Sequence, residues 1–272
     1  MATLTHKTLL YDGACPMCQA YSQGFVKLGT LTPQGRVSLM DADQATLAKV
    51  DINRARHQIP LVDTQTGEVL YGVDALGMVI SNTCPVMGEL PNKAWAKAPF
   101  RPLYSFISYN RRVIAGTGNS PCGNDYAPDF HLGWRMALIT GGISYTGLCI
   151  YLFCRIVGIA DVLQVFAFVF GYFMLLFTTN LFSAHTPQQK WDYLGHLGVL
   201  GIIEGSLFVL TALAARSSNM IGLLFAGQGA GRLLALYLHA QRVKANGYNP
   251  RLNIAFAVGA FMLVVYLAYI IR

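Results

Sequence analysis

Residues 9–18 read Leu-Leu-Tyr-Asp-Gly-Ala-Cys-Pro-Met-Cys, and this stretch decides the fold of the first part of the 272-residue chain. The apolar run over residues 7–11 ends at Asp12-Gly13, a common turn dipeptide, and so predicts a buried strand that enters a turn. Residues 16–29 have helical spacing and begin with a proline, which suits the first position of a helix. The two cysteines of the stretch are therefore expected at a strand-to-helix junction.

Hydrophobic patterning predicts a small α/β domain over residues 1–91. Beyond the first strand and helix, strands are expected at residues 36–40, 60–62 and 69–71, and helices at residues 45–50 and 74–83. The resulting order, β-α-β-α-β-β-α, is that of the thioredoxin fold. The turn between the first strand and the first helix is where an α/β sheet places its ligands. The predicted fold class is therefore an α/β thioredoxin-like N-terminal domain.

Cys15 and Cys18 are placed to act as a redox pair at this turn. A cysteine at the N-terminus of a helix meets free N–H groups and the positive end of the helix dipole, which favour its thiolate. Cys15 would then attack a disulfide, and Cys18, one turn further on, would resolve the mixed disulfide. A static disulfide is disfavoured in a reducing cytosol. The pair could also bind structural zinc or be inert buried thiols, although the chain has no second C-x-x-C and no H-x-x-x-H.

The run Tyr-Asp-Gly-Ala-Cys-Pro-Met-Cys at residues 11–18 resembles the Y-D-G-x-C-x-x-C signature of the DCC-type thiol-disulfide oxidoreductases, a thioredoxin-like family. The IPLVD run at residues 59–63 and the LYSFISYNR run at residues 103–111 resemble later segments of that family. The resemblance implies thiol–disulfide exchange with Cys15 and Cys18 as the reactive pair. It also implies that Pro60 is a cis proline beside the active site, with an ordinary trans turn proline as the alternative.

Other groups of the chain have less specific signals. Asp12 is expected either to accept a proton near the resolving thiol or, more simply, to close the turn. Cys84 and Cys122 are candidates for a third thiol that passes electrons on, or are small buried hydrophobic residues. Cys149 and Cys154 would point about 140° apart on a helix, so no disulfide is expected between them.

Composition predicts a water-soluble N-terminal half and a membrane-embedded C-terminal half. Charged residues make up 12% of the chain and hydrophobic residues 54%, whereas about a quarter of a typical soluble protein is charged. Five apolar stretches approach or exceed the roughly 20 residues that cross a bilayer. They lie at residues 136–154, 162–184, 193–215, 217–241 and 252–271. We therefore predict an all-α transmembrane bundle of about five helices over residues 134–272, unless a break at Gly227–Gly231 alters the count.

The net charge of +7 is carried mainly outside the thioredoxin-like domain. Residues 1–91 hold six basic and eight acidic groups, which argues against the basic surface of a nucleic-acid binder. Basic residues gather in the segment 92–135 and in alternate loops, which places the N-terminal domain in the cytoplasm and the C-terminus outside. No signal peptide is expected, because only a short apolar run follows Lys7. The expected location is thus the bacterial inner membrane.

Residues 92–133 are predicted to form a basic juxtamembrane linker. Within this linker, residues 100–114 have the pattern of an amphipathic helix, with Phe100 on its apolar side and the pair Arg111 and Arg112 among its polar residues. Such a helix would lie at the membrane interface and would hold the N-terminal domain against the bilayer.

Two charged residues fall deep within the predicted spans, where an unpaired charge is expensive. Glu204 and Arg232 lie about 10 and 9 residues from the inner ends of their helices, and this similar depth predicts an ion pair between them. Gln228, His196 and His239 are expected around the pair as a polar cluster. In one interpretation, the cluster hydrogen-bonds the carbonyl oxygens of a quinone. In a second, its histidines bind a metal or a haem. In a third, the ion pair only fixes helix packing.

The leading functional prediction is a membrane-bound thiol–disulfide oxidoreductase. Its expected partners are a protein or small-molecule thiol or disulfide and the lipid bilayer, with quinone as a candidate electron carrier and no cofactor firmly implied. The alternatives are a transporter or channel with a cytosolic redox-sensing domain, and a reductase whose helical bundle is only an anchor. No strand–GxGxxG–helix unit supports a nucleotide cofactor.

Overall fold

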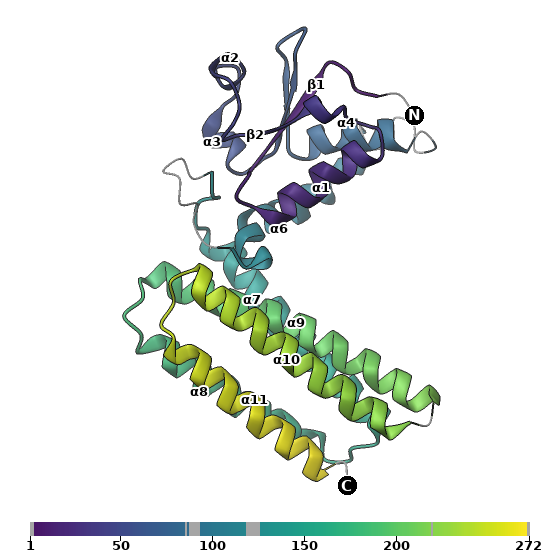
Figure 1. Ribbon diagram of the computed structural model, residues 1–272, viewed down its shortest axis with the longest axis vertical. Helices are drawn as coiled ribbons and strands as arrows, with labels where there is room; N and C mark the ends of the chain where they lie inside the picture. Colours follow the sequence, from purple (N-terminus) through teal and green to yellow (C-terminus); the bar gives the residue numbers. More distant parts are fainter. Residues whose placement is uncertain (1–2, 85, 87–92, 118–125, 219, 271–272) are drawn as a thin grey trace. The chain divides into compact units, whose positions relative to one another are not determined.

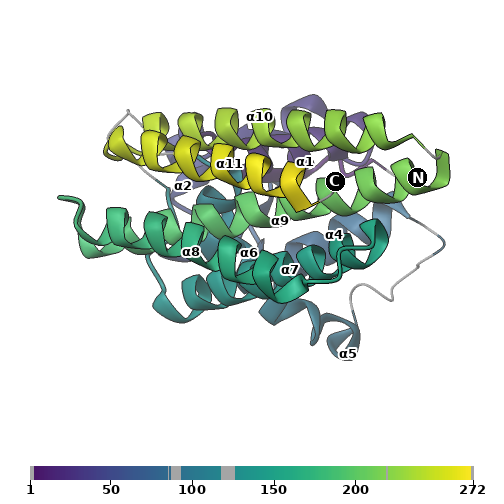
Figure 2. The same ribbon diagram turned by 90° about the horizontal axis from the view of Figure 1, so that it is seen from below.

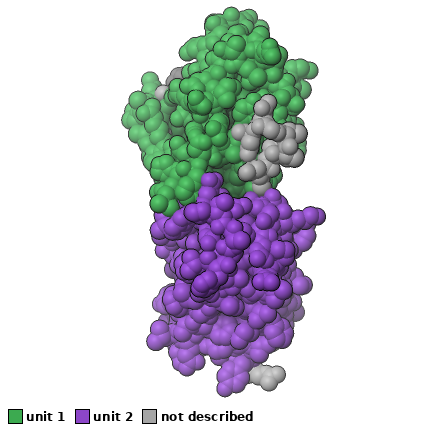
Figure 3. Space-filling view, turned by 90° about the vertical axis from the view of Figure 1, so that its left-hand side faces the viewer, with its two compact units in different colours: residues 1–134 green, residues 135–272 purple. Residues whose placement is uncertain are grey.

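The computed structural model describes residues 3–84, 86, 93–117, 126–218 and 220–270. The chain divides into two compact units, residues 1–134 and residues 135–272, which are coloured separately in Figure 3. The first unit contains a small sheet with short helices, and the second contains long apolar helices.

Within its described residues, the first unit is built on a four-stranded sheet whose order is β2-β1-β3-β4. The strands are β1 (Lys7–Tyr11), β2 (Arg36–Ser38), β3 (Pro60–Asp63) and β4 (Val69–Tyr71). β1 runs parallel to β2 and antiparallel to β3, with Leu9 opposite Leu61 in the second pair. β3 and β4 form the predicted hairpin, whose turn holds Gly67 at φ 77°, in the left-handed region that favours glycine.

Alternation along the two central strands buries apolar side chains on both faces of the sheet. Leu9 and Leu61 belong to one apolar cluster, which also contains residues of α1 (Pro16–Lys27) and α4 (Val73–Thr83). Leu10 and Val62, their neighbours in sequence, belong to a second cluster. The end of β1 is therefore held from both sides, and this fixes the position of the turn that follows it.

Short helices complete the first unit. They are a 3₁₀ turn (Pro33–Gly35), α2 (Gln44–Leu47), α3 (Ile52–Ala55), α5 (Ala94–Lys97) and α6 (Phe100–Ala115). Asp43 and Asp51 cap α2 and α3, because their carboxylates accept hydrogen bonds from the Thr46 and Arg54 N–H groups. The 3₁₀ turn, α3 and α5 were not expected from the sequence, because segments of three or four residues are too short to show a helical period.

α6 packs within the first unit, against α1, α4 and α5. Arg111 and Arg112 are buried there, 6% and 7% exposed. The predicted helix over residues 100–114 is present, but its two arginines are buried, because their guanidinium groups pair with a buried carboxylate. The exposed apolar side chains of α6 include Phe100, Leu103 and Ile107.

The described residues of the second unit form five long helices. They are α7 (Leu132–Val157), which begins three residues before the unit, α8 (Val162–Leu181), α9 (Pro187–Ser218), α10 (Ile221–Ala245) and α11 (Arg251–Ile270). α10 packs against both α9 and α11, and α11 also packs on α8. Figure 1 shows these helices from one side and Figure 2 shows them from below. α7 approaches α9 closely, because a Cβ on Gly142 would lie only 2.8 Å from the Gly198 Cα.

Four helices in the described part of the chain, α7, α8, α9 and α11, are long and apolar enough to cross a membrane. This composition indicates an integral membrane protein. α10 is not among the four, so the fifth span stays a prediction. It is nonetheless a continuous helix of 25 residues, and the break considered at Gly227–Gly231 is not found.

Candidate active site

The turn after β1 places both cysteines of the motif at the start of α1. Asp12 closes the turn, since its Oδ1 accepts a hydrogen bond from the Ala14 N–H at 3.1 Å and its carbonyl oxygen accepts one from the Cys15 N–H at 3.1 Å. Cys15 is the N-cap residue, with an extended backbone, and Pro16 is the first helical residue. Both cysteines are free thiols, and Cys18 lies in the first turn of the helix.

The environment of Cys15 favours its thiolate. Its pKa is lowered from 9.0 to about 6, first because the Cys18 thiol donates a hydrogen bond to it and then because the Cys18 N–H does so. The positive charge of Arg111 lowers this pKa further, while burial and the negative charge of Asp12 oppose the shift. At neutral pH Cys15 is therefore mainly a thiolate, which is the nucleophilic form of cysteine.

Cys18 has the opposite character. Its pKa is raised above 9.0, first because it donates a hydrogen bond to Cys15, then because it is buried and faces the negative charge of that thiolate. Tyr21, one turn along α1, donates a hydrogen bond to the Cys18 sulfur and partly offsets the rise. This asymmetry makes Cys15 the sulfur that attacks a substrate disulfide and leaves Cys18 as a protonated thiol in the resting dithiol.

The two sulfur-bearing side chains are also shielded from solvent. Cys15 has no exposed surface, and Cys18 is 5% exposed. A disulfide substrate can therefore reach Cys15 only after neighbouring atoms move. The same burial strengthens the charge interactions around Cys15, because little water screens them.

Two arginines of α6, Arg111 and Arg112, bind the carboxylate of the turn residue Asp12. Arg111 Nη2 and Arg112 Nη2 lie 3.0 and 3.2 Å from Asp12 Oδ2. Arg111 also donates hydrogen bonds to the carbonyl oxygens of Arg56 and Tyr126, at 2.7 Å each. Sequence reasoning assigned no role in the site to these arginines. Arg111 ends the run at residues 103–111 that resembles the oxidoreductase family, and Arg112 follows directly after that run.

Pro60 opens β3 opposite Tyr71. No peptide bond among the described residues is cis, so the expected cis proline at position 60 is not found. With this bond trans, the residue before the proline makes two hydrogen bonds. The Ile59 N–H donates to the Tyr104 hydroxyl, and the Ile59 carbonyl oxygen accepts from the Gly72 N–H. As the first strand residue, Pro60 also needs no ladder donor of its own.

The remaining cysteines lie apart from this pair in the chain. Cys84 follows α4 and is exposed, while Cys122 lies outside the described residues. Cys149 and Cys154 are buried free thiols in α7, and Cys149 packs where α7 meets Gly205 of α9. Neither of the last two belongs to the first unit.

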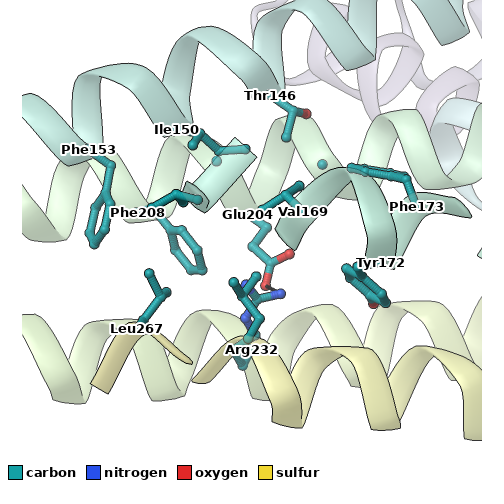
Figure 4. A pocket seen from close by; sticks show the side chains of 14 residues that line it. Thr146, Ile150, Phe153, Val169, Tyr172, Phe173, Glu204, Phe208, Arg232 and Leu267 are labelled. Carbon is teal, nitrogen blue, oxygen red and sulfur yellow. Dashed lines mark ion pairs between the residues drawn. The ribbon is translucent and has the colours of Figure 1, made fainter. Parts of the chain in front are cut away.

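The predicted ion pair in the helical unit is present. Arg232 Nη1 lies 2.7 Å from Glu204 Oε1, and the two side chains point toward each other between α9 and α10 (Figure 4). The Arg232 guanidinium also lies 4.9 Å from the centre of the Phe208 ring. The cavity around the pair holds about 50 Å³, which suits a few water molecules, whereas a cavity of about 150 Å³ accepts benzene. This space does not accommodate a quinone ring.

The other residues expected in that polar cluster belong to separate contacts. Gln228 Nε2 donates to Thr211 Oγ1 at 3.1 Å. His239 lies between the Tyr193 hydroxyl and Asn253 Oδ1, at 3.0 Å from each, and stacks on a phenylalanine. His196 is buried with its ring against Tyr248. Within the described residues, no three histidine, cysteine or acidic side chains are grouped so as to hold a metal ion.

Comparisons of this chain with protein-family models, with curated proteins and with solved structures find no match.

Proposed function

We propose that this integral membrane protein is a thiol–disulfide oxidoreductase whose first unit, a thioredoxin-like domain, carries the reactive pair Cys15 and Cys18. The Cys15 thiolate attacks one sulfur of a substrate disulfide, and the leaving thiolate takes a proton from water. Cys18 then loses its proton and attacks Cys15 Sγ, so that the second substrate thiol leaves and a Cys15–Cys18 disulfide forms. Two electrons pass from the protein to the substrate, and the reverse sequence oxidises a substrate dithiol.

One observation carries this proposal: two free thiols lie at the N-terminus of α1, with Cys15 as its N-cap residue, Cys18 in its first turn and the buried Arg111 as a nearby positive charge. Free N–H groups, the helix dipole and a cation favour a thiolate, whereas burial alone would disfavour one. The mixed sheet β2-β1-β3-β4, with the pair at the exit of β1, supports the thioredoxin-like assignment. The resemblance of residues 11–18 to the DCC-type signature supports the same chemistry.

The helical unit then anchors the domain at the membrane, on the cytoplasmic side if the basic loops face inward. Several polar groups of this unit contact each other, as in the Glu204–Arg232 and His239–Tyr193 pairs. We therefore assign the reaction to the first unit alone.

The test is to trap the mixed disulfide on the full chain in detergent. In a Cys18→Ser variant, oxidised glutathione should attach to Cys15 and remain there, as mapped by peptide mass spectrometry. In the unsubstituted protein the adduct should be replaced by a Cys15–Cys18 disulfide. A Cys84→Ser variant is the control and should behave as the unsubstituted protein does. Modification at Cys84 without any at Cys15 would contradict the proposal.

A further inference from the structure

A cavity of about 380 Å³ adjoins Cys18 in the first unit. Its volume lies within the roughly 300–1,000 Å³ of small-molecule sites. The walls are mainly apolar and include Phe25, Leu39, Ile59, Leu76 and Ile80. Cys18 and Tyr21 are part of the lining, and Cys15 is not. A molecule in this cavity would therefore meet the resolving sulfur first.

The polar part of the lining offers hydrogen-bond donors. Arg111 is 6% exposed, and its Nε has no hydrogen-bond partner among the described residues. The Tyr104 oxygen accepts from the Ile59 N–H at 2.9 Å, and no described residue accepts the phenol proton. Asp12, the one carboxylate in the lining, is already bound by two arginines. These groups select a ligand whose head carries acceptor oxygens and no positive charge.

A second apolar hollow of about 570 Å³ adjoins the first, between α4, α5 and α6. The two share four lining residues, Leu76, Ile80, Tyr104 and Ile107. Phe100 and Leu103 line the outer hollow and are 58% and 51% exposed. An apolar tail could thus continue from the cavity beside Cys18 to the apolar surface of α6.

We propose that this cavity binds the ring of an isoprenoid quinone, with its tail in the outer hollow, and that the Cys15–Cys18 dithiol reduces it. The inference rests on the proposed function, because it requires a reactive dithiol. A quinone takes up two electrons and two protons, as many electrons as the dithiol gives up. Its two carbonyl oxygens are acceptors, which match the Arg111 and Tyr104 donors. The site predicted around Glu204 and Arg232 is replaced by one in the first unit that has the required volume.

The reduction begins at the resolving sulfur. The Cys18 sulfur forms a bond to a ring carbon, and its proton passes to a ring oxygen. The Cys15 thiolate then attacks Cys18 Sγ; the S–S bond forms, the C–S bond breaks, and its electron pair stays on the ring. The second ring oxygen takes a proton from water. Dithiol and quinone become disulfide and hydroquinone, with Arg111 and Tyr104 holding the ring oxygens throughout.

The experiment compares two oxidants on the pre-reduced full chain in lipid nanodiscs under anaerobic conditions. One is a ubiquinone analogue with a short isoprenoid tail, and the other is oxidised glutathione. Formation of the Cys15–Cys18 disulfide is followed by alkylation and mass spectrometry. An Ile107→Trp variant fills the junction of the two hollows. Leu28→Trp is the matched control, because Leu28 is 52% exposed and lines neither of them.

We expect both oxidants to form the disulfide. The ratio of the quinone rate to the glutathione rate should fall at least ten-fold in Ile107→Trp and stay within two-fold in Leu28→Trp. Oxidation by glutathione but not by quinone would overturn this inference and leave the proposed function standing. Equal ratios in the two tryptophan variants would also overturn it. If neither oxidant forms the disulfide, the proposed function fails together with the inference.

Discussion

Arg111 Nη2 lies 3.0 Å from Asp12 Oδ2, although the two residues are 99 positions apart in the chain. Asp12 belongs to the turn that positions Cys15, and Arg111 belongs to α6, so the contact joins the redox turn to a helix beyond the α/β core. The same guanidinium lowers the pKa of Cys15. Because both side chains are buried, salt screens this interaction little. One helix therefore holds the turn and supplies positive charge to the nucleophile.

Replacing Arg111 by Met should raise the pKa of Cys15 from about 6 by about one unit, since an opposite charge at close range has an effect of this size. It should also lower stability by about 1–3 kcal/mol, because it leaves a buried carboxylate with fewer partners. Alkylation rates measured against pH report the pKa, and thermal unfolding reports the stability. Arg111→Lys keeps a positive charge and should therefore raise the pKa of Cys15 less than Arg111→Met does. Arg101→Met, an exposed change on the same helix, should have neither effect.

Cys15 also makes the stability of the reduced protein depend on pH. Its pKa is about 6 in the folded state, against an ordinary value of 9.0. For an acid with a lowered folded pKa, the contribution to stability is fully present above the unfolded pKa and is lost as the pH falls through the folded value. The unfolding temperature of the reduced protein, relative to a Cys15→Ser variant, should therefore rise between about pH 6 and pH 9. A difference that stays constant across that range would contradict the lowered pKa.

Tyr21 should affect the resolving step without affecting the first attack. Its hydroxyl donates a hydrogen bond to Cys18 and lowers the pKa of that thiol. A Tyr21→Phe variant should form the mixed disulfide at Cys15 at a normal rate and convert it to the internal disulfide several-fold more slowly. Quenched-flow alkylation separates the two steps. Tyr11→Phe is the control, because Tyr11 is also half-buried but stacks on Arg36 instead. Equal slowing in both variants would exclude a specific role for the Tyr21 hydroxyl.

Local features of the first unit follow from the sequence because short-range rules determine them. The Asp-Gly turn and the proline at the start of α1 are adjacent to the reactive pair. The bounds of β1 match the prediction, and α1 begins at the predicted Pro16 but ends at Lys27, two residues earlier than expected. The Asp12–Arg111 contact could not be foreseen, since no periodicity links a turn to a helix 99 residues away. The same limit explains why the burial of Arg111 and Arg112 was not predicted.

In the helical unit, the sequence predicts how far along its helix a polar side chain lies, but it does not predict which side chains surround it. Counting residues from the helix ends placed Glu204 and Arg232 at one level, and the structure has them 2.7 Å apart. His239 and Gln228 share a face of α10 with Arg232, yet they contact Tyr193 and Thr211. Which partner a buried polar group finds depends on how the helices are rotated against each other, and a single sequence does not specify that rotation.

Neutralising only one residue of the Glu204–Arg232 pair should lower the stability of the protein more than neutralising both. Glu204→Gln leaves a buried guanidinium without its counter-charge and should destabilise the protein by about 3–5 kcal/mol. The double variant Glu204→Gln/Arg232→Gln should recover part of this loss, because it leaves no unpaired charge. Thermal unfolding in detergent measures both effects. A double variant that loses the sum of the two single losses would show that the residues do not interact.

The alkylation rate of Cys15 as a function of pH, measured on the reduced full chain with each cysteine mapped by mass spectrometry, shows whether Cys15 is the nucleophile. We predict a midpoint at about pH 6 for Cys15, with Cys18 unreactive throughout the neutral range. A Cys15 midpoint near the ordinary thiol value of 9.0, or faster alkylation of Cys18 than of Cys15, would contradict the assignment of Cys15 as the nucleophile.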